Sequence, residues 1–414
     1  QRMWDTTQLF QAPATYAVAD EPFNTMANDP VRPLLYDGLS YEGKPTRVFA
    51  WYGAPVGASA EKPVPAMVLV HGGGGTAFRK WVKLWNDRGY AAIAMDTCGH
   101  LPIPLDSDSK PWPKHAFSGP AGWGDYGNMD KPIGDHWAYH AVAAVVLGHS
   151  LIRSFPEVDA SRIGVTGISW GGYLTCIVAG VDDRFRFAAP VYGCGFLGEG
   201  SAWLGRMRGM GTEKAMRLST LWDPSQYLVY ARMPMLFCNG TNDNFFWPPA
   251  WMKSTSITKG PVNRYYKPRM PHGHAPSGDP KEITAFADAV LKGAQPLPNF
   301  TVFSHDNRRI QAQVASPTDI AGAEIIYTAT NTGEWKSRQW LSIPIAITKD
   351  NAAGVEGVNG TDGTAGTKGT DGTAVVVGSI RLDVTAPADA IAAYLAVTDS
   401  RGLFVSSPVI FWLE

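Results

Sequence analysis

The sequence RIGVTGISWGG, residues 162–172, decides the fold of this 414-residue chain. Its first part, RIGVTG, predicts a buried strand, and residues 171–180 predict the helix that follows. Gly167 and Gly171 flank Ser169 in the pattern Gly-x-Ser-x-Gly between the two elements. A sharp strand-to-helix turn needs small flanking residues because its backbones pass closely, and it presents the serine hydroxyl at the carboxyl end of the sheet. The stretch therefore predicts a nucleophilic serine at Ser169; the alternative is an ordinary glycine-rich turn.

Strands and helices alternate on both sides of this stretch. Apolar runs predict further buried strands at residues 65–70, 90–95, 187–192, 233–238 and 264–270, and helices at residues 78–88, 136–155 and 280–292. Residues 31–55 predict a β-hairpin ahead of them, with alternating apolar positions and glycine-containing turns. We therefore expect an α/β fold with a mostly parallel sheet and helices on both of its faces.

The pattern changes near residue 298. Short alternating segments separated by turn residues continue to the end of the chain, which predicts a C-terminal all-β sandwich of immunoglobulin or fibronectin type. Residues 351–373 are of low complexity and predict an extended hairpin or flexible loop. We therefore expect a catalytic domain at residues 1–296, including an N-terminal extension and the hairpin, and a sandwich domain at residues 297–414.

The composition excludes several classes of protein. Lys and Arg number 36 against 37 Asp and Glu, so no basic surface for nucleic acid is expected. No apolar run reaches the roughly 18 residues of a membrane-spanning helix. The low charged fraction of 18% and the 15 tryptophans are consistent with a protein that binds neutral polymers. A loop-rich protein of any other function could have the same composition. Because the chain begins with Gln1, we expect a removed signal peptide and a secreted or periplasmic protein.

The four cysteines fit neither a CxxC pair nor a zinc site. Three of them, Cys176, Cys194 and Cys238, lie in apolar runs, which favours buried thiols. A disulfide between Cys194 and Cys238 is the alternative, if their strands are neighbours.

The sequence HGGGGT, residues 71–76, directly follows a predicted buried strand. Acyl transfer places negative charge on the carbonyl oxygen of the substrate, and two backbone N–H groups commonly stabilise it. Glycines allow the backbone to approach that oxygen. We assign one donor to the N–H of Trp170 and the other to Gly73 or Gly74. The alternative is a phosphate-binding loop, but neither the GxxxxGK[ST] nor the GxGxxG pattern is completed.

Candidates for the acid and the base follow in the chain order Ser, Asp, His of serine hydrolases with such a turn. Asp243 lies in a Gly/Asn turn after a strand, and Asp223, which precedes a proline, is the less favoured rival. The general base is His272 or His274, in the sequence PHGH, with His272 preferred because it is the first residue beyond the strand and its proline. The two histidines lack a third ligand at useful spacing, so no metal is expected.

Aromatic residues after Asp243 are candidates for the substrate pocket. The run from Asn244 onward would overhang the site, and we expect its aromatic side chains and one from the long Gly/Pro/Trp-rich loop to form walls: Phe246, Trp247, Trp251 and Trp123. Aromatic residues serve at least as often in the core, which is the alternative for each.

Taken together, these motifs resemble the dienelactone hydrolase, acetyl xylan esterase and prolyl oligopeptidase-like branch of the α/β-hydrolases. The similarity covers about residues 45–293 and includes HGGGGT, GYAAIAMD, RIGVTGISWGG, the Asp-Pro-Ser sequence, NGTND and PHGH. It implies a triad of Ser169, Asp243 and His272 or His274, and no cofactor. The chain departs from dienelactone hydrolases, which generally use a cysteine, and it lacks the β-propeller repeats and the glutamate pair of prolyl peptidases.

The resemblance favours a serine carboxylesterase that deacetylates or otherwise de-esterifies a polysaccharide, although feruloyl and other aryl esters fit the aromatic walls equally well. A peptidase or amidase with the same triad is one alternative. A catalytically dead binding protein is another, which the intact motifs oppose. The sequence leaves the acyl group, the alcohol and the oligomeric state open.

Overall fold

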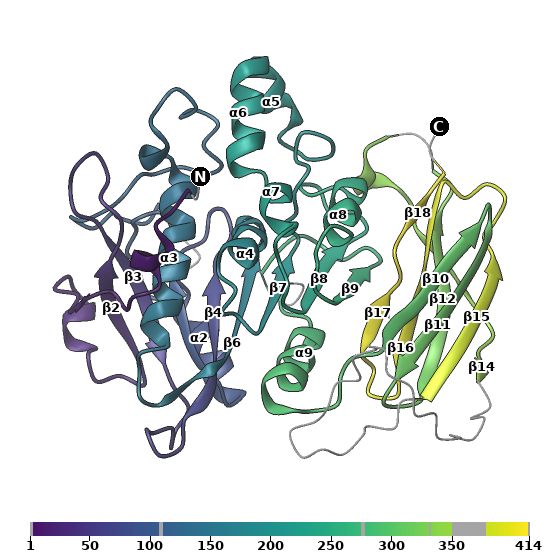
Figure 1. Ribbon diagram of the computed structural model, residues 1–414, viewed down its shortest axis with the longest axis horizontal. Helices are drawn as coiled ribbons and strands as arrows, with labels where there is room; N and C mark the ends of the chain where they lie inside the picture. The colour runs from purple at the N-terminus through teal and green to yellow at the C-terminus, as the bar shows by residue number, and fades with distance from the viewer. Residues whose placement is uncertain (1–2, 107–110, 275–277, 331–332, 350–377, 413–414) are drawn as a thin grey trace. The chain divides into compact units, whose positions relative to one another are not determined.

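The computed structural model describes residues 3–106, 111–274, 278–330, 333–349 and 378–412 (Figure 1). The predicted low-complexity loop at residues 351–373 lies outside these residues. By their internal contacts the residues form two compact units, residues 1–262 with 270–279, and residues 263–269 with 280–414. This division groups residues 280–296 with the second unit, and the predicted domain boundary at residue 296 stays a prediction.

A nine-stranded sheet organises the first part of the chain, with the order β1-β2-β3-β5-β4-β6-β7-β8-β9. Neighbours from β5 to β8 pair in parallel, and β1, β2, β3 and β5 pair antiparallel in sequence. The strands are β1 (Thr15–Tyr16), β2 (Val31–Asp37), β3 (Arg47–Gly53), β4 (Val64–Val70), β5 (Ala91–Met95), β6 (Val158–Ile168), β7 (Phe187–Val191), β8 (Met235–Gly240) and β9 (Val262–Lys267). The pairing of β2 with β3 is the hairpin that the sequence predicts.

Every residue of β5, β7 and β8 is buried, as are all but the first residue of β4. A parallel sheet buried to this extent has both faces covered. The helices are α1 (Thr6–Leu9), α2 (Arg79–Asp87), α3 (Trp137–Ile152), α4 (Trp170–Val181), α5 (Leu204–Gly209), α6 (Thr212–Trp222), α7 (Ser225–Leu228), α8 (Pro248–Thr255) and α9 (Lys281–Lys292). Helices α3 and α4 pack against each other and against the central strands (Figure 1).

The C-terminal part forms two antiparallel sheets in a sandwich-like arrangement (Figure 1). One has the order β10-β11-β15-β14, the other β13-β12-β16-β17 with β18 also paired to β16. Alternate residues of β11 are buried, as expected for a strand with one face on a core. The strands are β10 (Asn299–Asp306), β11 (Arg309–Ser316), β12 (Ile320–Thr328), β13 (Leu341–Pro344), β14 (Thr348–Lys349), β15 (Gly378–Thr385), β16 (Ala392–Asp399), β17 (Phe404–Ser406) and β18 (Ile410–Phe411). The predicted fold class is confirmed.

All four cysteines are buried thiols, so the alternative of a disulfide between Cys194 and Cys238 is wrong. Burial in an apolar environment raises the pKa of Cys98, Cys176 and Cys194 above the ordinary value for a thiol. These thiols are therefore protonated at neutral pH and poor nucleophiles.

Candidate active site

Ser169 stands at a sharp turn between β6 and α4. Its φ of 59° and ψ of −115° place it in a strained region of backbone conformation. The turn is held by hydrogen bonds from Ser169 N–H to the carbonyl of Val191 (2.9 Å) and from Tyr173 N–H to the carbonyl of Ser169 (2.9 Å). Ser169 itself is only half-buried, so its hydroxyl is presented at the carboxyl end of the strand as the sequence predicts.

The flanking glycines are required by close backbone contacts. A Cβ atom on Gly167 would lie 2.2 Å from the carbonyl oxygen of Gly171, and a Cβ on Gly171 would lie 2.0 Å from the carbonyl oxygen of Val70. Both distances are far below van der Waals contact, and the opposing atoms are backbone atoms. Only glycine therefore allows α4 to start this close to β4 and β6.

We expect Gly171→Ala to lower the free energy of unfolding by about 3 kcal/mol, because the added methyl group must push the first turn of α4 away from β4. The apparent Tm should fall by roughly 6–12 °C, and labelling of Ser169 by a fluorophosphonate should fall with it. Gly205→Ala is the matched control, since Gly205 lies in α5 with no atom within 4 Å of an added Cβ. A Tm for Gly171→Ala within 1 °C of the control would contradict the close contact described here.

Ser169, His272 and Asp243 form a hydrogen-bonded chain. The Ser169 Oγ lies 2.9 Å from His272 Nε2, and His272 Nδ1 lies 2.7 Å from Asp243 Oδ2. The carboxylate of Asp243 is fully buried, and the His272 side chain keeps 14% of its surface exposed. The other carboxylate oxygen of Asp243 accepts the N–H groups of Phe245 (2.7 Å) and Phe246 (2.8 Å), which fixes its orientation. The structure thus brings together the three residues that the sequence places in the triad.

Tyr192 holds His272 in place, a role that the sequence analysis missed. Its hydroxyl hydrogen-bonds the carbonyl groups of Pro271 (2.9 Å) and Gly273 (3.1 Å), on either side of the histidine. Its ring lies against the imidazole, with the centroids 4.2 Å apart. The only sequence signal is that Tyr192 ends the apolar run of β7, next to the strand that carries Ser169.

His274, the alternative base, lies beside the glycine loop. Its Nε2 would be 3.6 Å from a Cβ on Gly72, and its ring packs edge-on against Phe78 at 5.1 Å. The hydrogen bonds to Ser169 and Asp243 are made by His272.

The rival acid, Asp223, has a structural task. Its two carboxylate oxygens accept the N–H groups of Phe196 (2.8 Å), Leu197 (2.9 Å) and Ser225 (2.9 Å). It therefore ties the segment after β7 to the start of α7, which is the capping role that its Asp-Pro sequence suggests.

Backbone donors for an oxyanion lie beside Ser169. Trp170 is the first residue of α4, so its N–H has no carbonyl partner within the helix. In the loop after β4, the N–H of Gly75 donates to the carbonyl of Gly72 (3.0 Å), which leaves Gly73 and Gly74 at the apex of the turn. A Cβ on Gly73 would lie 2.5 Å from Trp170 Cδ1, so the two predicted donor segments are in close contact.

The side chain of His71 holds this glycine loop in place through hydrogen bonds. Thr97 N–H donates to its Nε2 (3.0 Å), so the ring hydrogen sits on Nδ1, which lies 2.9 Å from the carbonyl of Gly72. Burial lowers the pKa of His71, and the neutral ring therefore persists at neutral pH.

The predicted aromatic walls fall into two groups. Phe246 and Trp251 are fully buried in the core, so in this structure neither faces solvent at the site. Trp247 and Trp123 are partly exposed, and Trp123 packs edge-on against His71 at 5.7 Å. Two further aromatic residues, Trp203 and Phe245, lie near the site. The ring centroid of Phe245 is 4.7 Å from that of His272, and Phe245 stacks on Trp203 with their centroids 5.8 Å apart.

Within the described part of the chain, no group of three or more His, Cys, Asp or Glu side chains is arranged to hold a metal ion. Among the same residues, no helix has the length and apolar character needed to cross a bilayer.

Comparisons with known proteins agree with this architecture. Residues 29–199 match the model of the acetyl xylan esterase (AXE1) family, and residues 204–337 match that of the PhoPQ-activated pathogenicity-related protein. The acetyl xylan esterase from Paenibacillus sp. R4 superposes with a TM-score of 0.55 at 21% identity, over 69% of this chain and 92% of that one. Acetyl xylan esterase 1 from Thermoanaerobacterium sp. JW/SL YS485 gives a TM-score of 0.50 at 16% identity, over 64% and 86% of the two chains.

The curated relatives that match part of this chain carry the names of peptidases. The uncharacterized peptidase YuxL of Bacillus subtilis (strain 168) is 28% identical over 149 residues, which are 34% of this chain and 19% of that protein. This chain spans about a fifth of the length of the curated relatives it matches. The sheet order and the elbow define an α/β-hydrolase fold. Within that superfamily, residues 29–199 are similar to the acetyl xylan esterase (AXE1) family.

Proposed function

We propose that this protein is a serine carboxylesterase that removes acetyl or other small acyl groups from a polysaccharide. The observation that carries the proposal is the hydrogen-bonded chain from Ser169 through His272 to Asp243, beside the glycine loop. The match of residues 29–199 to the acetyl xylan esterase family supports an ester rather than an amide as the substrate.

The geometry accounts for each step of ester cleavage. Ser169 Oγ attacks the ester carbonyl carbon while His272 Nε2 takes its proton, and the buried Asp243 stabilises the imidazolium that forms. The carbonyl oxygen becomes negative and is stabilised by the N–H of Trp170 and that of Gly73 or Gly74. The C–O bond to the alcohol then breaks, and His272 returns the proton to the departing oxygen. Water, deprotonated by His272, hydrolyses the acyl-enzyme and frees the acid and Ser169.

The test compares ester and amide substrates under one set of conditions. We expect hydrolysis of p-nitrophenyl acetate to exceed that of the butyrate and the octanoate, and acetate to be released from acetylated xylan. Peptide p-nitroanilides should be cleaved far more slowly. Activity on anilides alone would replace the esterase proposal with a peptidase, as the curated relatives suggest. Failure of a fluorophosphonate to label Ser169 would favour a binding protein without catalysis.

A further inference from the structure

The segment that carries His272 is flanked on both sides by elements of the second compact unit. Residues 270–279 group with the first unit, whereas residues 263–269, which include most of β9, and residues 280–414, which include α9, group with the second. The chain therefore leaves the second unit after Arg269, supplies the triad histidine, and returns at Pro280. The separation between the two ends of this segment is set inside the second unit.

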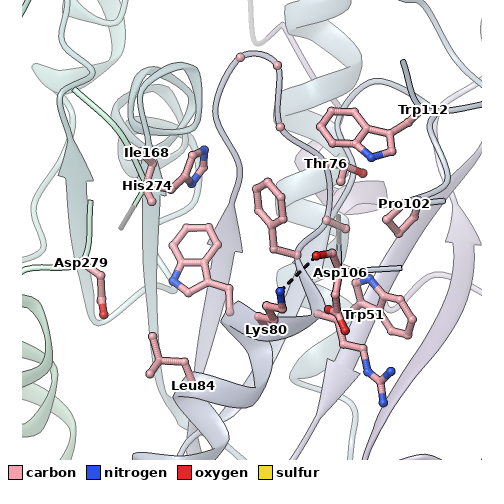
Figure 2. Close-up of a pocket in the computed structure, with 17 residues that line it drawn as sticks. Trp51, Thr76, Lys80, Leu84, Pro102, Asp106, Trp112, Ile168, His274 and Asp279 are labelled. Carbon is pink, nitrogen blue, oxygen red and sulfur yellow. Dashed lines mark hydrogen bonds between the residues drawn. The ribbon is translucent and has the colours of Figure 1, made fainter. Parts of the chain in front are cut away.

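Contacts within the first unit hold the middle and the end of the same segment. Besides the hydrogen bonds of Tyr192 on either side of His272, Asp279 accepts two hydrogen bonds from the guanidinium of Arg88 (3.1 and 2.6 Å). His274 and Asp279 also line a cavity of about 600 Å³ beside the glycine loop (Figure 2). These contacts orient the segment, and the elements at its two ends limit where it can lie.

Strand β17 connects the two flanking elements through one residue, Phe404. Its backbone N–H donates to Oε1 of Glu282 in α9 (2.8 Å). Its ring meets β9, with its centroid 5.7 Å from that of Tyr265 and the ammonium of Lys267 4.1 Å above it. Phe404 and Glu282 are each only 3% exposed, so solvent cannot replace these contacts. Phe404 thus fixes α9 and β9 relative to each other.

Two further hydrogen bonds tie the backbone of β9 to the sandwich. The hydroxyl of Tyr394 in β16 donates to the carbonyl of Tyr266 (2.8 Å), and both side chains are fully buried. The hydroxyl of Ser406 in β17 donates to the carbonyl of Arg264 (3.3 Å). Because the acceptors are main-chain atoms, these bonds fix the path of the strand itself.

A glutamate at position 282 is hard to explain by stability alone. The other buried residues of α9 are apolar: Ile283, Phe286, Ala287 and Leu291. Burial raises the pKa of the Glu282 carboxyl, which means that the site disfavours the charge. A buried carboxylate costs free energy that an apolar side chain would not, and the bond to the Phe404 N–H gives it a geometric task.

The backbone at Arg269, the last residue before the segment, is also constrained. Its φ of 55° lies in the left-handed region, which is unfavourable for a residue with a side chain. Such a conformation persists where the surrounding structure fixes it, and at functional sites it commonly serves to aim a side chain. The chain therefore enters the His272 segment in a direction that β9 and its contacts determine.

We infer that Glu282 and Phe404 are positioning residues for His272, an inference that rests on the proposed hydrolase function. By fixing α9 and β9 to each other, they set the span of the segment between them. That span keeps the imidazole within hydrogen-bond distance of Ser169 and Asp243. The C-terminal sandwich is then a part of the catalytic apparatus and not an independent module.

The test compares Glu282→Ala with Glu282→Gln in the full chain. Alanine removes the acceptor of the Phe404 N–H, whereas glutamine keeps a carbonyl oxygen. We expect Glu282→Ala to lower kcat for p-nitrophenyl acetate about tenfold and to change KM less than about twofold, since a displacement of about 1 Å can cost about a hundredfold. Glu282→Gln should keep kcat within about twofold, because the acceptor is retained. Acylation and deacylation both need the imidazole, so kcat falls whichever step limits it.

A second readout needs no substrate. The N–H between His272 Nδ1 and Asp243 should give a far-downfield proton NMR resonance, which Glu282→Ala should broaden or lose. Val314→Ala is the control for stability: Val314 is fully buried in β11, which pairs with β10 and β15. It should lower the Tm at least as much as Glu282→Ala while kcat and the resonance stay unchanged, with all assays run well below the lowest Tm.

Equal kcat values for Glu282→Ala and Val314→Ala, or an unchanged resonance in Glu282→Ala, would overturn the inference. If Glu282→Ala does not fold, Tyr394→Phe provides the same test, because it removes only the hydroxyl that binds β9. It should lower kcat about threefold, the size of a weak buried hydrogen bond, and an unchanged kcat would again overturn the inference.

The two readouts also separate this inference from the proposed function. If the unaltered protein hydrolyses no ester and a fluorophosphonate does not label it, the proposed function fails. Loss of the resonance in Glu282→Ala would then still support the positioning role. If esters are hydrolysed and neither kcat nor the resonance responds to Glu282→Ala, the positioning inference fails alone.

Discussion

Ser169→Ala should lower kcat for p-nitrophenyl acetate by about 10⁵–10⁶-fold, the loss typical of removing the nucleophile of a hydrogen-bonded triad. The hydroxyl is the only atom removed, and it is the atom within hydrogen-bond distance of His272. The backbone that holds the turn is unchanged, since the hydrogen bonds of Ser169 to Val191 and Tyr173 are made by its main chain. Steady-state release of p-nitrophenol at high enzyme concentration measures the residual rate.

The control for this substitution is Ser161→Ala, an exposed serine at the other end of the same strand. It should keep full activity and full labelling by a fluorophosphonate, whereas Ser169→Ala should lose both. Turnover by Ser169→Ala within tenfold of the unaltered protein would show that another group is the nucleophile.

His272→Ala should lose about as much as Ser169→Ala, because without the imidazole nothing accepts the proton from the serine. His274→Ala should keep p-nitrophenyl acetate hydrolysis within about tenfold, since the hydrogen bonds to Ser169 and Asp243 belong to His272. The two variants form a matched pair, two residues apart in one turn, and comparing their Tm values separates loss of folding from loss of catalysis.

Added imidazole provides a second readout for this pair. It should restore part of the activity of His272→Ala, because it can enter the space that the side chain vacates and act as a base. It should do nothing for His274→Ala. The reverse order of losses would assign the base to His274 and would mean that the turn rearranges when substrate binds.

The fold and the chemical elements of the site could be predicted from local sequence because local constraints determine them. The turn around Ser169 needs glycines on both sides, and the parallel strands need uninterrupted apolar runs. Each of these signals lies within a stretch of a few residues. It can therefore be recognised without knowing which distant residues the stretch contacts.

The choice between His272 and His274 could not be made with the same certainty, because it depends on contacts with distant residues. Tyr192, about eighty residues earlier, fixes the carbonyl groups on both sides of His272. Nothing in the sequence PHGH reports that contact. A related reason applies to two of the four residues predicted to form aromatic walls. Phe246 and Trp251 carry the same apolar signal whether they pack in a core or line a pocket, and here they are buried.

The cavity of about 600 Å³ beside the glycine loop could not be predicted from the sequence, because its wall combines segments that are far apart in the chain. Trp51 comes from β3, Phe78 immediately precedes α2, and Trp112 comes from the long loop after β5. Each has an ordinary explanation on its own. Only the folded chain shows that the indole N–H groups of Trp51 and Trp112 lack acceptors among the described residues.

The cavity of about 600 Å³ beside the glycine loop has a consequence for the design of covalent inhibitors. Reagents that acylate or phosphonylate a serine carry a group that stays on the enzyme and a group that departs. The cavity beside Gly73 and Ile168 has room for one of these two groups, whereas the rings of Trp170 and Trp203 pack against each other with their centroids 4.7 Å apart. In the serine hydrolase proposed here, selectivity of an inhibitor should therefore be built into the group that reaches the cavity.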